Sequence, residues 1–140
     1  ARLYEHLMKG KSLFASVNAY ISGDVDEGMF VFTGQLLPTT SEQEAEAAFW
    51  EEIALLQGAE ISDYELEKVK NKFEANTLFG ELNVMNKAMN LGYYSMIDDL
   101  PLINREIDIY RSLTKSEIAD FSKRVFTQEN SSTLIYRATK

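Results

Sequence analysis

The chain has 140 residues and an apolar content of 45%, the size and composition of one globular domain with one core. Its formal net charge of −8 argues against nucleic-acid binding, which needs a basic surface to neutralise phosphates. The apolar runs are too short to span a bilayer, and the absence of cysteine excludes disulfides and thiolate metal sites. The first residues hold no signal-peptide core, and the compartment stays open, cytoplasmic or periplasmic if the source is bacterial.

The charges are divided unevenly along the chain. No lysine or arginine occurs between Ser12 and Glu67, although 12 of the 22 acidic residues lie in that stretch. A block of like charges indicates a solvated face. The alternative interpretation is a surface that attracts basic peptides.

Two strands are predicted after a short N-terminal helix. Residues 2–9 have helical spacing, and Gly10 ends that helix. From residue 13 the apolar period changes to two, so one face of a strand over 13–21 carries Leu13, Ala15, Val17, Ala19 and Ile21. The polar turn GDVDEG at 23–28 leads to a second strand at 29–37, and together they predict a β-hairpin.

Helices dominate the next hundred residues. Three of them begin with a hydroxyl and a carboxylate three residues apart, the capping-box spacing: Ser41 with Glu44, Ser62 with Glu65, and Thr114 with Glu117. Gly58 ends the first helix, Gly80 bends or breaks the second, and Pro101 fits the first turn of a further one. A stripe with helical spacing follows Gly80, and its methionines are expected to fill the core: Leu82, Met85, Met89, Tyr93 and Met96.

A third strand is predicted over 132–138, where Leu134 and Tyr136 alternate with Ile135 and Arg137. The predicted fold class is therefore α+β, an antiparallel sheet with helices packed on one face. No linker or internal repeat divides residues 1–140, which predicts a single domain.

The residues form no constellation that supports catalysis. His6 is the only histidine and belongs to no H-x-x-E-H or H-E-x-x-H motif, so it cannot complete a catalytic metal site or a Ser–His–Asp triad. The neighbouring carboxylates Glu51 and Glu52 diverge on a helix and do not suggest a glycosidase. The residues thus predict no catalytic residue, no metal ligand and no cofactor in this chain.

Four segments, taken in order, resemble the pitrilysin/insulinase family of zinc metallopeptidases, which includes the mitochondrial processing peptidases. SLFASVNAYISGDVDEGMFVF at 12–32 is similar to the family's hairpin, and EAEAAFWEEIALLQGAEISDYELEKVKNKF at 44–73 to its helix, short loop and E-L-E-x-x-K helix. NLGYYSMIDD at 90–99 and SLTKSEIADFSKRVFTQENSSTLIY at 112–136 match its later helices and final strand. The shared order of these segments carries the resemblance.

The resemblance implies that zinc is held by a catalytic half with an inverted H-x-x-E-H motif, which this chain lacks. The chain would be part of the non-catalytic C-terminal half, which closes over the zinc site and helps to enclose a peptide chamber. The implied partners are a catalytic half-domain or partner subunit, and peptide substrates. Many active members contact substrate through an arginine and a tyrosine seven residues apart. The matching positions here are Met8 and Ala15, which cannot donate hydrogen bonds, so a structural or degenerate half is implied.

The family also has a strand and more helix before the segment that ARLYEHL resembles, so the chain is expected to lack the first part of its domain. The unpaired sheet edge or uncovered apolar face that results predicts self-association of the isolated chain. The alternative function is a stand-alone protein-interaction module of the same fold with no protease activity.

Overall fold

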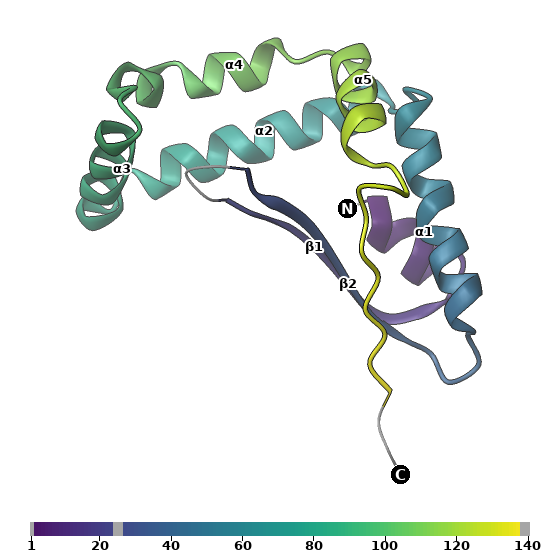
Figure 1. Cartoon of the computed structure of the whole chain (residues 1–140). Coiled ribbons are helices and arrows are strands. Elements are labelled where there is room, and N and C mark those ends of the chain that lie inside the picture. The colour runs from purple at the N-terminus through teal and green to yellow at the C-terminus, as the bar shows by residue number, and fades with distance from the viewer. Residues whose placement is uncertain (1, 24–26, 138–140) are drawn as a thin grey trace.

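The computed structural model describes residues 2–23 and 27–137 (Figure 1). Its elements in chain order are η1 (Tyr4–Gly10), β1 (Phe14–Ser22), β2 (Met29–Leu36), α1 (Glu42–Gln57), α2 (Asp63–Gly80), α3 (Val84–Met96), η2 (Leu100–Asn104), α4 (Glu106–Ser112) and α5 (Lys115–Val125). The architecture is α+β with an antiparallel hairpin and packed helices, as predicted. Within the described ranges, no helix has the length and apolar character needed to cross a membrane.

The hairpin pairs β1 with β2 from Phe14↔Leu36 to Ser22↔Met29, and a bulge at Ala15 interrupts the register. The bulge changes which side chains face the core. Leu13 and Phe14 are both buried, whereas Ala15, which was predicted to share the face of Leu13, is exposed. Gly34 makes this possible, because a Cβ at that position would lie 2.6 Å from the ring of Phe14. Part of the predicted turn, residues 24–26, lies outside the described residues.

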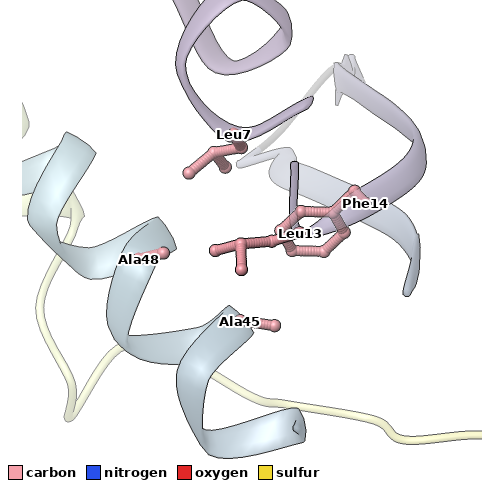
Figure 2. Close-up of a cluster of buried hydrophobic side chains, with 5 residues drawn as sticks. All are labelled: Leu7, Leu13, Phe14, Ala45 and Ala48. Carbon is pink, nitrogen blue, oxygen red and sulfur yellow. The ribbon is translucent and has the colours of Figure 1, made fainter. Parts of the chain in front are cut away.

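The core lies between η1, the start of the hairpin and α1. Figure 2 shows its buried members, which come from three separate segments: Leu7, Leu13, Phe14, Ala45 and Ala48. The two alanines keep α1 thin on this side, so that the larger side chains of η1 and β1 can pack against it. Beside them, the rings of Phe14 and Phe32 meet edge to face at 5.8 Å, and Phe32 stacks on Phe49 at 4.6 Å.

The three predicted helix starts are confirmed. Ser41 accepts a hydrogen bond from the backbone N–H of Glu44, and Ser62 accepts one from Glu65. Only Thr114 forms the complete reciprocal box, in which the side chain of its third residue, Glu117, also bonds back to the cap. Helix α2 ends at Gly80, as predicted. Pro101 lies in the first turn of the short 3₁₀ helix η2, and α4 follows η2.

The prediction of a third strand is wrong over the residues that can be checked. Residues 131–137 are extended but pair with neither strand, and position 138 is outside the described residues. Side-chain bonds tie the segment to α1 instead. Thr133 donates to Glu46 at 3.1 Å, and Arg137 makes a bidentate pair with Glu42 at 2.7 Å. Arg137 lowers the pKa of Glu42 by hydrogen bonding. The alternating pattern thus produced an extended segment whose backbone pairs with no described strand.

The prediction that the methionines after Gly80 fill the core is also wrong. Met85, Met89 and Met96 are all largely exposed on α3. The spacing of these residues correctly predicted a helix. Burial of the methionines would also require a second element packed on their face of that helix.

The elements pack as two units. The sheet unit comprises η1, β1, β2, α1 and α5, and the helical unit comprises α2, α3, η2 and α4. In Figure 1 the helical unit extends from the sheet unit toward the left, with α3 at its end. The whole chain exposes 10481 Å². A compact monomer of 15.9 kDa exposes about 7,400 Å², so this chain has a large surface that packs on nothing within it.

Candidate functional site

The candidate site is the junction between η1 and β1, residues 4–15, where the backbone is unusually irregular. η1 is a π-helix, a rare form that concentrates at functional sites. It ends with Lys11 N–H donating to the carbonyl of His6 at 2.8 Å, and Ser12 then takes a left-handed φ of 52°. The bulge at Ala15 completes the irregular run. Such features persist only where the surrounding structure holds them in place.

Backbone bonds and the core hold this junction. The N–H of Leu13 donates to the carbonyl of Leu7 at 3.1 Å, and the N–H of Leu37 donates to the carbonyl of Leu13 at 3.1 Å. The Leu7 and Leu13 side chains are buried against α1 (Figure 2). The turn from helix to strand is therefore fixed from both sides.

The two positions that the resemblance matched to substrate contacts lie on opposite sides of this turn. Met8 is half-buried on η1, and Ala15 is exposed at the bulge of β1. Since bulges re-aim side chains, the exposure of Ala15 is a property of the backbone here rather than of strand alternation. The role of these positions toward substrate stays a prediction.

A polar cluster under the junction was missed by the sequence reasoning. Glu52 is 4% exposed, and its Oε2 lies 2.6 Å from Nδ1 of His6 and 3.9 Å from Nη1 of Arg2. Arg2 also donates to both carboxylate oxygens of Glu65, at 3.1 and 2.8 Å. The cluster ties the N-terminal helix to α1 and to the first turn of α2.

A signal for this cluster does exist in the sequence. Glu52 follows Ala45 and Ala48 at intervals of three and four residues, so it occupies a core-facing position of α1. An acidic residue at such a position needs a buried partner, because an unpaired buried charge is costly.

These contacts also answer whether the residues fit a zinc ion. His6 contacts Glu52 through Nδ1 and has no other potential ligand beside it, since no group of three or more histidine, aspartate or glutamate residues is arranged to hold a metal over 2–23 and 27–137. The described residues therefore do not fit zinc. The junction is a turn that backbone hydrogen bonds and core packing hold in place, and Glu52 joins it to α1 through His6 and Arg2.

Six of the 12 acidic residues in the stretch from Ser12 to Glu67 pair with basic residues from outside it: Glu42, Glu51, Glu52, Asp63, Glu65 and Glu67. Besides the pairs already named, Lys11 bonds Glu51, Lys115 lies 2.6 Å from Asp63, and Arg111 lies 3.5 Å from Glu67. Charges that are segregated along the sequence are thus brought together in space. Many of the acidic side chains in this stretch therefore contribute to cross-links between elements.

A second polar contact lies in the helical unit. The Tyr94 hydroxyl donates to Oε2 of Glu106 at 2.7 Å and joins α3 to α4. Burial, together with this carboxylate, raises the pKa of Tyr94 to about 12. At ordinary pH the hydroxyl keeps its proton and acts as a donor, so this pair is a structural link.

Comparison with curated proteins gives no match. A protease from Helicobacter pylori has the same fold, with a TM-score of 0.79 at 19% sequence identity over 87% of this chain. The chain spans 30% of that protease chain.

The family model described as the peptidase M16 inactive domain matches residues 1–73, which include the junction, the hairpin and α1. This confirms the inferred resemblance to the non-catalytic half of a peptidase. Since the match covers more than half of its residues, the chain belongs to the peptidase M16 inactive-domain family.

Proposed function

We propose that this chain works as the non-catalytic wall of an M16-type peptidase, closing over a separate catalytic half and helping to enclose the peptide substrate. The observation that carries the proposal is the family match over residues 1–73. The matched residues include the junction, with its π-helix and the left-handed Ser12. A catalytic half, with zinc, would be supplied by another part of the same protein or by a partner subunit.

The contribution of this domain would be shape rather than hydrogen bonding to substrate. Met8 and Ala15 offer a thioether and a methyl group where active members have an arginine and a tyrosine. The ion pairs of the acidic stretch favour the same conclusion, because Glu42, Glu51 and Glu52 are already engaged by basic residues of this chain. Recognition of basic peptides by these carboxylates would have to break those pairs.

The large exposed surface supports a partner on this domain. The chain exposes roughly 3,000 Å² more than a compact monomer of its mass. A standard protein–protein interface buries about 1,600 Å² in total, so the excess is enough for more than one such contact.

The test begins with the complete gene and its neighbours, where an H-x-x-E-H motif should be encoded. Cleavage of a quenched fluorescent peptide is then measured with the catalytic half alone and with this domain added. We expect a rise in kcat/KM of at least tenfold on addition, because enclosure positions the peptide. No H-x-x-E-H half in either place, or no effect of addition, would contradict the proposal and leave the stand-alone interaction module.

A paired variant tests the role of the junction. Met8→Arg with Ala15→Tyr restores the donors of active members, and we expect a lower KM with little change in kcat. The matched control is Tyr4→Arg with Asn18→Tyr, which adds the same side chains at neighbouring exposed positions of η1 and β1. An equal effect of both pairs would show that these positions are not special.

A further inference from the structure

A polar hollow of about 270 Å³ lies in the helical unit, between α2, α3 and α4. Its lining draws on all three helices: Asn76 and Gly80 of α2, Asn86 and Asn90 of α3, and Glu106 of α4. All of these residues lie beyond the segment 1–73 that the family model matches. An inference about the hollow therefore does not rest on the proposed function.

Helix α3 lines the hollow mainly with polar groups. Asn86, Asn90 and Tyr94 follow one another at intervals of four residues, which places them on one side of the helix, and all three line the hollow. A helix that follows another usually packs on it through apolar side chains. Here the side of α3 nearest to α2 presents two amides instead, and both asparagines are exposed, so a ligand can reach them from solvent.

Two of the polar groups are oriented by their neighbours. Nδ2 of Asn86 donates to the carbonyl of Gly80 at 3.4 Å, which turns Oδ1 of the same amide away from that carbonyl. The Tyr94 hydroxyl donates to Oε2 of Glu106 at 2.7 Å, which leaves Oε1 to accept from another donor. Among the residues that the structure describes, the lining includes no lysine or arginine. The hollow thus offers oriented oxygen acceptors and one negative charge.

A planar cation with several N–H donors suits this arrangement. Guanidinium carries five N–H donors in one plane, so it can bond a carboxylate and amide oxygens at the same time. It is weakly hydrated, and Met89 adds an apolar side chain to the lining. An ammonium is a compact and strongly hydrated charge, so entering the hollow would cost it more hydration.

We propose that the hollow binds a guanidinium group, as carried by arginine, with Glu106 supplying the charge and Asn86 and Asn90 supplying acceptor oxygens. The test is an NMR titration of the chain with Nα-acetyl-arginine amide, followed through the side-chain amide signals of the asparagines. We expect saturable shifts at roughly millimolar concentration. Nα-acetyl-lysine amide should bind at least fivefold more weakly, and Nα-acetyl-citrulline amide, which is neutral and similar in shape, at least tenfold more weakly.

Variants locate the binding in the hollow. Glu106→Gln removes the charge but keeps an acceptor oxygen for Tyr94, and it should weaken binding at least tenfold. Asp108→Asn is the matched control, because it removes the same charge from an exposed position two residues further along α4; it should change the dissociation constant less than twofold. Asn90→Ala, at an exposed helix position, should weaken binding at least threefold and provides a second variant if circular dichroism shows that Glu106→Gln unfolds.

The source of the guanidinium group is distinguished by two further probes. Free arginine and a capped tripeptide with arginine at its centre are titrated in the same way. Tighter binding of free arginine would identify a small-molecule ligand, and equal or tighter binding of the tripeptide would identify an arginine side chain of a polypeptide.

Three results would overturn the proposal. The first is the absence of saturable shifts up to roughly 20 mM arginine probe. The second is equal binding of the lysine probe, which would reduce the effect to attraction between opposite charges. The third is equal weakening by Glu106→Gln and Asp108→Asn, which would show that the hollow is not where the probe binds.

Discussion

Glu51 and Glu52 are adjacent, carry the same charge and belong to the same helix, yet the same substitution should cost far more stability at Glu52 than at Glu51. The side chain of Glu51 is 65% exposed and contacts Lys11, whereas that of Glu52 is 5% exposed and contacts His6 and Arg2. Glu51→Lys breaks an exposed pair, which is worth about 0–1 kcal/mol. Glu52→Lys instead buries an ammonium group beside two basic side chains, and breaking a buried pair costs about 3–5 kcal/mol.

Urea unfolding followed by circular dichroism measures the difference. With a slope of about 2 kcal/mol per molar, Glu51→Lys should lower the midpoint by less than about 0.5 M. Glu52→Lys should lower it by about 2 M, or leave the chain unfolded in buffer. Glu52→Gln keeps the shape and an acceptor oxygen, so its loss should be intermediate, about 1.5 kcal/mol. Equal midpoints for the two lysine variants would refute the buried cluster beneath the junction.

Three further predictions concern local features. Ala59 has a left-handed φ of 59°, which glycine adopts without strain, so Ala59→Gly should stabilise the chain by about 0.5 kcal/mol in thermal unfolding. The control Ala54→Gly, within α1, should destabilise the chain by about 1 kcal/mol in the same measurement. The pKa of Tyr94 is about 12 in the folded state and about 10 when unfolded, so the free energy of unfolding should fall as pH rises from 10 toward 12. The absorbance titration of the tyrosines should show one ionisation near pH 12, and Tyr94→Phe should abolish it. Thr114→Ala should cost about 1 kcal/mol by uncapping α5, and since Thr114 hydrogen bonds lower the pKa of Glu117, NMR titration should show that pKa returning toward 4.5.

Helix starts and the hairpin could be predicted because their causes are local. Ser41, Ser62 and Thr114 satisfy backbone N–H groups within three residues of themselves, so the sequence contains both partners. The alternation of residues 14–22 and 29–36 likewise finds its partner a few residues away. What failed depends on distant partners. Residues 132–137 alternate as a strand does, but a strand also needs an edge to pair with, and no pattern within the segment supplies one.

The helix-to-strand junction could be predicted from the sequence, but the contacts that support it could not. The resemblance located Met8 and Ala15, while the π-helix, the left-handed Ser12 and the bulge depend on how the core closes over Leu7 and Leu13. The partner of Glu52 could not be read from spacing, because His6 is 46 residues away in the sequence. Most of the long-range ion pairs share this property: each joins two segments that the sequence presents as separately acidic or basic.

Helix α2 is bound near its first turn, so a small rotation there moves the far end of the helical unit by a larger distance. With 18 residues, α2 is about 27 Å long, and near its first turn Arg2 bonds the carbonyl of Glu60 and the carboxylate of Glu65. A rotation of about five degrees at that end would displace the other end by roughly 2 Å over this length. Arg2 thus helps to fix the angle of α2, together with Lys115, which pairs with Asp63 in the same turn. If a partner displaced η1 and Arg2, the resulting movement of α3 would be larger than the movement at the first turn of α2.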